Sequence, residues 1–94
     1  MATYIMFGKI SVESAGEMSA ERTKKANAII EDCGGKVKAV YALLGKIDVV
    51  AIVDFPGTKE AMKAGVKLTK LLGISFATAP AVTMEEFDKL IEER

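Results

Sequence analysis

The stretch KVKAVYALLGKIDVVAIVDF, residues 36–55, decides the fold of this chain. Its first part, 37–43, is rich in β-forming residues and partly alternates, and its second part, 49–53, contains no polar residue. A short continuous apolar run is typical of a strand that is buried on both faces. Gly45 lies in the link between the two parts and favours a turn, and Pro56 ends the second part because proline cannot donate to a ladder. The stretch therefore predicts a β-hairpin.

Two further strands are expected on either side of this hairpin. Residues 3–12 are substantially apolar on both alternating faces. Residues 74–82 form a weaker pattern that contains Pro80, and a proline inside a strand places it at the edge of a sheet. The most apolar strands, the first and the third, are therefore expected at the centre.

Three helices are predicted around these strands. Each begins near a residue whose side chain can accept a hydrogen bond from a free backbone N–H. The candidates are Ser14 (with Glu17) or Ser19, then Thr58, then Thr83. The apolar stripe of the first helix ends at Gly34, which suits a left-handed cap. Gly65 is expected to let the second helix approach the sheet, and Glu86 completes a capping box for the third.

The order β-α-β-β-α-β with a terminal helix predicts the α+β class: a ferredoxin-like, four-stranded antiparallel sheet in one domain, residues 1–94. Right-handed crossovers place both crossover helices on the same face. Alternation leaves open which residues face away from them. The uncovered set is either Tyr4, Met6 and Ile10 or Ile5 and Phe7 from the first strand, joined by either Val50 and Ile52 or Val49, Ala51 and Val53.

Either choice exposes several large apolar side chains in a monomer. Such a patch usually marks an interface, and a second copy is the simplest cover. We therefore expect a homodimer or higher oligomer, joined sheet to sheet as a dimeric α/β barrel. The alternative is a monomer whose terminal helix folds over the open face.

Composition narrows the class of protein further. Lys and Arg together number 13, as do Asp and Glu, and this balance argues against nucleic acid or an anionic membrane as a partner. Cys33 is the single cysteine, which fits a reducing cytoplasm. Histidine is absent, so the commonest metal ligand and neutral-pH base are missing, and we expect no metal site and no cofactor.

The sequence resembles the GYD domain family. The resemblance is carried by residues 34–41, 44–53, 4–9 and 83–87. Gly45 and Asp48 match two members of the namesake trio, but Ile47 stands where the family has its tyrosine, so any role of that hydroxyl is absent or passes to Tyr41. The resemblance implies a fold similar to dimeric α/β barrels and to ligand-binding domains of some small transcriptional regulators, with no assigned reaction.

Five residues are candidates for binding a ligand: Tyr4, Met6, Lys9, Tyr41 and Asp48. Asp48 is either a polar anchor in a cavity or a turn aspartate that accepts backbone N–H groups. Tyr41 either donates to a ligand or anchors an interface. Arg22 either binds a carboxylate or is solvated on its helix.

Three functions remain open at this stage. The leading hypothesis is a small homo-oligomeric protein that binds a small apolar or amphipathic ligand between sheets. The alternatives are a cofactor-free dimeric-barrel enzyme, of the small oxygenase or isomerase type, and a purely structural association module. No catalytic residue is identified by the sequence.

Overall fold

The computed structural model of the chain describes residues 1–92, except for the side chains of residues 13 and 14. Its elements are β1 (Ala2–Ile10), α1 (Val12–Ala15), α2 (Ala20–Asp32), β2 (Lys36–Ala42), β3 (Val49–Phe55), α3 (Thr58–Leu72), β4 (Ile74–Ala81) and α4 (Met84–Glu92). The strands form one antiparallel sheet in the order β2-β3-β1-β4. The predicted α+β class and the central position of β1 and β3 are confirmed.

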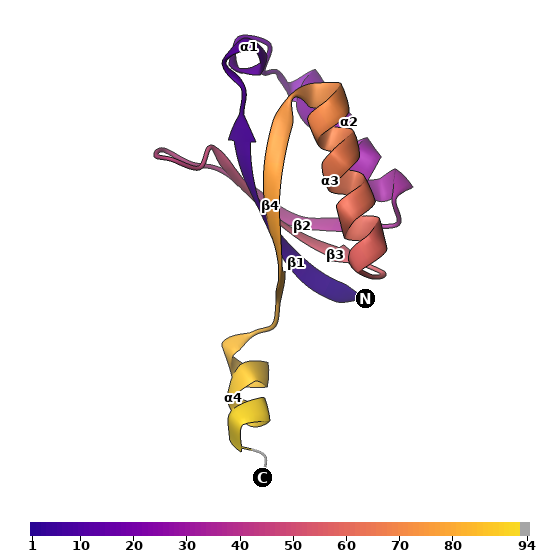
Figure 1. The fold of residues 1–94 in the computed structure, drawn as a ribbon, viewed down its shortest axis with the longest axis vertical. Coiled ribbons are helices and arrows are strands. Elements are labelled where there is room, and N and C mark those ends of the chain that lie inside the picture. The colour runs from indigo at the N-terminus through magenta and orange to yellow at the C-terminus, as the bar shows by residue number, and fades with distance from the viewer. Residues whose placement is uncertain (93–94) are drawn as a thin grey trace.

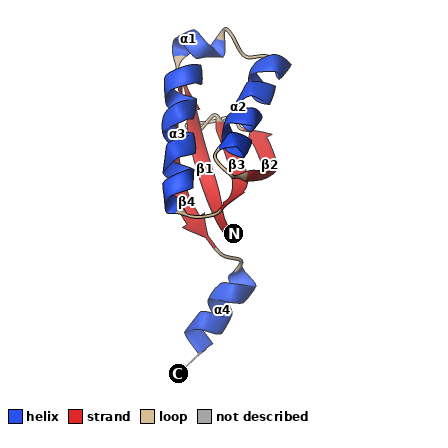
Figure 2. Ribbon diagram, turned by 90° about the vertical axis from the view of Figure 1, so that its right-hand side faces the viewer, coloured by secondary structure: helices blue, strands red, loops and turns tan. Residues whose placement is uncertain are grey.

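The two long helices lie on one face of this sheet (Figures 1 and 2). Figure 2 shows α2 and α3 side by side over the strands, and the two helices contact one another. The short helix α1, which the sequence did not predict, lies between β1 and α2. Within residues 1–92 no helix has the length and apolar character needed to cross a membrane.

The N-terminus of α2 is as predicted and that of α3 is not. Ser19 is the N-cap of α2, and its Oγ accepts from the backbone N–H of Arg22 at 3.2 Å. The side chain of Ser14 lies outside the described residues. The prediction that Thr58 caps α3 is wrong, because the extended Gly57 occupies the cap position. Thr58 is the first helical residue, and its hydroxyl is hydrogen-bonded to another part of the fold, as described below.

The core lies between α2, α3 and the covered face of the sheet. Its largest fully buried side chains are Phe55, Met6, Leu68 and Val53. Fully burying such a side chain contributes roughly 1.5–3 kcal/mol through the hydrophobic effect. Strands β1 and β3 supply residues of one alternating phase to this core, so the phase that the sequence left open is decided: Tyr4 and Met6 point inward, and Ile5 and Phe7 point outward.

One glycine of β1 makes this packing possible. A Cβ added at Gly8 would come within 2.6 Å of both the Phe76 ring and the Val49 side chain. The absent side chain therefore lets Phe76 lie across β1. The prediction that Gly65 gives α3 a close approach to the sheet is wrong, since a Cβ built there meets nothing within 4 Å.

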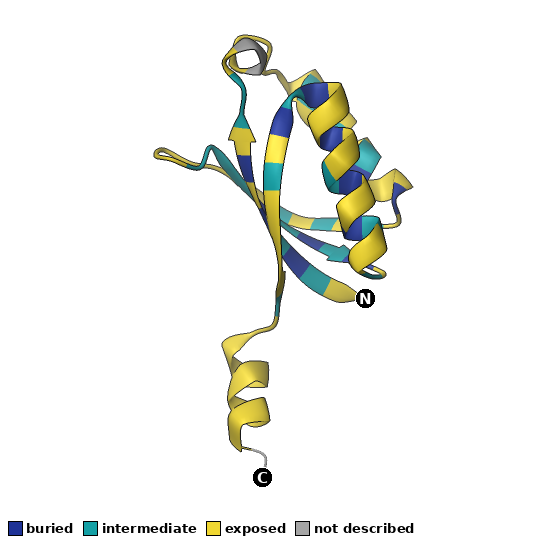
Figure 3. Ribbon diagram, viewed as in Figure 1, coloured by how far each residue is buried: buried dark blue, intermediate teal, exposed yellow. Residues whose placement is uncertain are grey.

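Helix α4 begins at the predicted capping box. The Thr83 Oγ1 accepts from the Glu86 backbone N–H, and the Glu86 carboxylate accepts from the Thr83 backbone N–H, both at 3.1 Å. The helix points away from the rest of the molecule, and none of its described residues is buried (Figures 1 and 3). The alternative of a monomer roofed by its own terminal helix is therefore wrong, and the open face of the sheet is uncovered.

Candidate functional site

The open face of the sheet carries two apolar rows that run across all four strands. The pairing register sets them in place, because residues paired across antiparallel strands project to the same face. One row consists of Ala77, Phe7, Val50 and Tyr41, and the next consists of Ala79, Ile5, Ile52 and Ala39. Residue Phe7 is 39% exposed and residue Tyr41 is 58% exposed. We call these two rows the open-face patch.

Polar groups lie at both ends of this patch. At one end, the Thr3 hydroxyl donates to the Asp54 carboxylate at 2.7 Å, and the Lys38 ammonium lies 3.8 Å from the same carboxylate. At the other end, Lys9 pairs with Ser75, whose hydroxyl donates to the Lys9 carbonyl at 3.5 Å. The patch is thus an apolar centre between two polar borders.

The structure separates the five candidate residues rather than bringing them together. Lys9 and Tyr41 lie on the open face, at the border and in the patch. Tyr4 and Met6 lie on the opposite, covered face, where they are 5% and 0% exposed. Asp48 lies outside the strands, immediately before β3. No single site contains all five.

Tyr4 takes part in the packing of the core. Its ring meets that of Phe55 edge to face, with centroids 5.8 Å apart, and its hydroxyl lies 3.1 Å from the Thr58 hydroxyl. A buried tyrosine usually finds such a partner for its polar end. This bond also explains why the Thr58 side chain is not a cap, because it faces the sheet.

Asp48 is bonded to the backbone on three sides. Its Oδ2 accepts from the Ile10 N–H at 2.8 Å, its own N–H donates to the Gly8 carbonyl at 2.9 Å, and its carbonyl accepts from the Leu43 N–H at 2.8 Å. These bonds join the β2–β3 hairpin to the end of β1. The arrangement matches the turn aspartate that the sequence left open as one of two interpretations.

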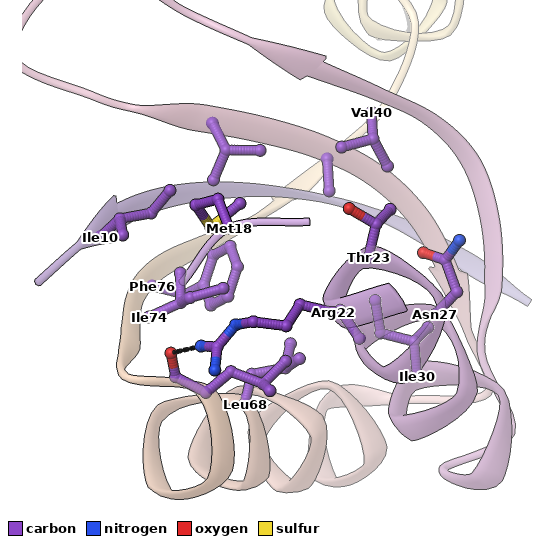
Figure 4. A pocket seen from close by; sticks show the side chains of 14 residues that line it. Ile10, Met18, Arg22, Thr23, Asn27, Ile30, Val40, Leu68, Ile74 and Phe76 are labelled. Carbon is purple, nitrogen blue, oxygen red and sulfur yellow. Dashed lines mark hydrogen bonds between the residues drawn. The ribbon is translucent and has the colours of Figure 1, made fainter. Parts of the chain in front are cut away.

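A second region of interest lies on the covered face. There a cavity of about 80 Å³ lies between α2, α3 and the sheet. Figure 4 shows its lining side chains, with Arg22 extending between the sheet and Leu68 of α3. The Arg22 side chain is 20% exposed, so it is not the solvated surface residue that the sequence allowed as one alternative.

Sequence reasoning missed two polar residues that the fold places at the border of the open-face patch, Thr3 and Asp54. Neither is among the candidates from the sequence, although Asp54 follows Val50 and Ile52 at intervals of two and so shares their face. For Arg22 the sequence left two interpretations open, binding of a carboxylate or solvation on its helix. Its place beside the cavity depends on how α2 packs against α3, which no local pattern encodes. Among the described residues, no cluster of three acidic or cysteine side chains suits a metal ion.

Known proteins support the fold and the family. The family model of the GYD domain matches residues 4–91. The structure is similar to the crystal structure of the leucine response regulatory protein of Mycobacterium tuberculosis, with a TM-score of 0.57 at 10% sequence identity. That similarity covers 87% of this chain but 51% of the regulator, so this chain spans about half the regulator's length, and the likeness shows the fold alone. No functionally curated protein matches the sequence.

Proposed function

The chain belongs to the GYD domain family, and on that premise we propose that it acts as a homodimer that holds a small apolar or amphipathic ligand between two sheets. The observation that carries this proposal is the open-face patch, which no other part of the described chain covers. Contiguous apolar patches larger than about a few hundred Å² are uncommon on monomeric proteins and usually mark interfaces.

The patch suits a second copy of itself. In a two-fold dimer the same surface serves both subunits, so it must complement itself. An apolar centre with Phe7, Ile5 and Ile52 meets this requirement, because aliphatic and aromatic side chains pack without needing a specific partner charge. Covering the patch stabilises the dimer by roughly 25 cal/mol per Å² of buried apolar surface. The entropy lost when two subunits associate opposes this stabilisation.

Helix α4 supports the same assembly. Its Phe87, Leu90 and Ile91 lie at spacings of three and four along the helix, and they are 44%, 64% and 63% exposed. An amphipathic helix of this kind needs an apolar surface to pack against. Because α4 extends beyond its own sheet, we propose that the second subunit supplies that surface (Figure 1).

The borders of the patch favour an amphipathic ligand. The Tyr41 ring lies in the apolar row and its hydroxyl can donate or accept, while Lys9 provides a cation at one end. The Asp54 carboxylate, with its partners Thr3 and Lys38, provides an anion and a hydroxyl at the other. A ligand with an apolar body and one polar end would therefore find partners for both parts.

No observation favours the enzyme over the binding protein. A general base must reach the proton that it abstracts, and the Asp48 Oδ2 already accepts the Ile10 N–H. The structural association module shares the proposed dimer and differs by binding nothing, so a ligand assay separates the two. We place this function in the cytoplasm because Cys33 is a free, buried thiol.

Sedimentation velocity at micromolar concentration tests the dimer. We expect the natural chain to sediment at twice the monomer mass and Phe7→Glu to sediment as a folded monomer, since a buried carboxylate on the patch is strongly unfavourable. Met62→Glu is the matched control, because Met62 is an exposed apolar residue of α3 on the other face. It should remain dimeric. A natural chain that is monomeric throughout would reject the dimer.

Native mass spectrometry of the purified dimer tests the ligand. We expect a bound small molecule, or uptake of added probes, among which leucine is a first choice as the amphipathic amino acid in the name of the similar regulator. Tyr41→Phe should weaken binding about fivefold or more through loss of one hydrogen bond while leaving the dimer intact. A stable dimer that binds nothing would favour the association module.

A further inference from the structure

A groove of about 500 Å³ lies between α3 and β4, which is an edge strand of the sheet. Its apolar wall is formed by Ala61, Met62 and Val66 of α3 and by Phe76 of β4. Met62 and Val66 are exposed, although both are large apolar residues. Exposed apolar side chains that gather along a groove indicate a surface for another molecule.

The groove adjoins the open-face patch. Successive residues of a strand point to opposite faces, so Phe76 and Thr78 line the groove while Ala77 and Ala79 belong to the patch. The two surfaces therefore meet at the β4 edge. A partner that covers the patch also lies next to the groove.

A row of lysines follows one side of the groove. Lys59, Lys63 and Lys70 are four and seven residues apart, so they share one side of α3, and Lys70 lines the groove itself. Helix α3 carries one further lysine, Lys67, and a single acidic residue. The groove is thus an apolar surface with a positively charged border.

Helix α4 has the complementary pattern. Its exposed apolar stripe, which contains Leu90, follows one side of the helix. Beside this stripe, Glu85, Asp88 and Glu92 lie three and four residues apart and form an acidic row. The whole of α4 has four carboxylates and one lysine, so its net charge is opposite to that of α3.

The lengths of the two surfaces also match. Helix α4 has 9 residues, and the part of α3 that lines the groove extends from Ala61 to Lys70. At the rise of an α-helix, each is about 14 Å long. The groove can therefore hold the whole of α4.

From this complementarity we propose that α4 of one subunit docks in the α3–β4 groove of a second copy and runs antiparallel to α3. The orientation follows from the handedness of the helices. Viewed from its apolar side with the N-terminus at the bottom, each helix carries its charged row on the right. Two such faces bring the rows together only when the helices run in opposite directions. This places Glu85 opposite Lys70, and the same register brings Ile91 near Met62.

The docking rests on the homodimer proposed above and names the surface that holds α4. The helix extends away from its own sheet and its own α3, so the groove that it fills belongs to the other copy (Figure 1). Two-fold symmetry then fills both grooves, one with each α4. A second groove, between α2 and α3, suits the helix less well, because Asp32 among its lining residues would repel the acidic row.

Disulfide trapping between separately purified variants tests the docking. Met62→Cys mixed with Ile91→Cys should form a covalent heterodimer on oxidation, identified by its mass. Met62→Cys mixed with Met84→Cys is the matched control and should not. Met84 lies on the same side of α4, seven residues from Ile91, and would reach position 62 only in a parallel arrangement. Cys33 is buried and should not compete.

Charge reversal, followed by sedimentation at several protein concentrations, tests the pairing of the rows. Lys70→Glu should raise the dissociation constant of the dimer about fivefold or more, because two ion pairs per dimer become like-charge contacts. Adding Glu85→Lys to Lys70→Glu should return the constant to within about twofold of that of the natural chain. Lys67→Glu makes the same change of charge away from the groove and should alter the constant by less than about twofold.

The results also keep the docking apart from the homodimer itself. Met62→Glu should remain dimeric through the sheets, while its α4 amides lose their protection against hydrogen exchange. A dimer in which neither mixture cross-links, or in which Lys70→Glu and Lys67→Glu act alike, would overturn the docking and leave the sheet-to-sheet dimer in place. A covalent heterodimer in the control mixture would overturn the antiparallel orientation. A natural chain that is monomeric throughout would reject the docking and the proposed function together.

Discussion

The two faces of the sheet are built from the same strands and are nearly equally apolar, yet one is buried under helices and the other is accessible to solvent. On the covered face, Met6 and Val53 are completely buried under α2 and α3. On the open face, Phe7 and Ile52 occupy neighbouring positions of the same strands and remain accessible. Hydrophobicity alone therefore does not identify the core of this fold. What distinguishes the faces is charge, because Lys9 and Asp54 share the open phase and no charged residue of β1 or β3 shares the covered one.

The largest expected difference in the free energy of unfolding is between alanine variants of one phenylalanine from each face. Phe55→Ala empties a fully buried position and should lower the free energy of unfolding by about 3–5 kcal/mol. Phe7→Ala should cost about 1 kcal/mol or less within a subunit and act mainly on association. Urea unfolding at two protein concentrations checks this, since only a loss of association depends on concentration. Equal, concentration-independent losses would mean that the faces do not differ as described.

The next largest expected effect is an opposite change in stability when each of two glycines is replaced by alanine. Gly8→Ala should destabilise the chain by about 1–3 kcal/mol, because its Cβ would overlap Phe76 and Val49 on the covered face. Gly65→Ala should stabilise it by about 1 kcal/mol, since a Cβ there meets nothing within 4 Å and alanine is the better helix former. Thermal unfolding of the two variants checks the opposite signs. A neutral Gly8→Ala would show that Phe76 can move aside.

A smaller effect is expected from the two tyrosines. Tyr4→Phe removes the bond between its hydroxyl and that of Thr58 and should cost about 1 kcal/mol. Tyr41→Phe should leave the stability of the subunit unchanged, because its side chain is largely exposed. Chemical denaturation of both variants, with Thr58→Val as the partner in a double-mutant cycle, checks the assignment. Additive effects of Tyr4→Phe and Thr58→Val would rule out the bond.

The smallest effect concerns α4, which belongs to neither face. Hydrogen bonds from the Thr83 backbone and side chain hold the pKa of the exposed Glu86 carboxyl below its ordinary value of 4.5. The ionised form is therefore favoured in the folded helix. Its support for α4 is complete above pH 4.5 and is lost as the pH falls through the lowered folded value.

An NMR titration of the Glu86 carboxyl checks this sign. The midpoint should lie below 4.5 in the natural chain and should move upward in Thr83→Val, which removes the side-chain bond and keeps the shape. Unfolding of the sheet should not accompany the titration, because α4 extends away from the sheet and none of its described residues is buried. An unchanged midpoint in Thr83→Val would mean that the capping box does not form in solution.

Much of the fold was predictable from local pattern. The apolar run of 49–53, the hairpin at Gly45, the glycines after α2 and the Thr83–Glu86 box each indicate an element or its end. The errors at Thr58 and Gly65 have one cause. Both were assigned a local role, as a cap and as a contact point, but the neighbours that α3 meets are set by tertiary packing.

The candidate site was less predictable than the fold. Tyr4, Met6 and Tyr41 are candidates by residue type, and type does not say toward which face a strand residue points. The signal that was present, the charges of Lys9 and Asp54, would have fixed the phase, because a charged side chain is costly beneath a helix layer. No comparable pattern in the sequence indicates that Arg22 lies beside a cavity.

The sequence by itself determined the order of strands and helices, the antiparallel topology and the presence of more apolar surface than one helix layer covers, because these follow from periodicity and from the handedness of crossovers. Only the tertiary structure decided which apolar face is buried, that α4 projects away from its own sheet, and that Arg22 lies beside a cavity. The packing of the covered face depends on side chains far apart in the chain, such as Phe76 and Val49 around Gly8, and such fits are not encoded in any local run of residues.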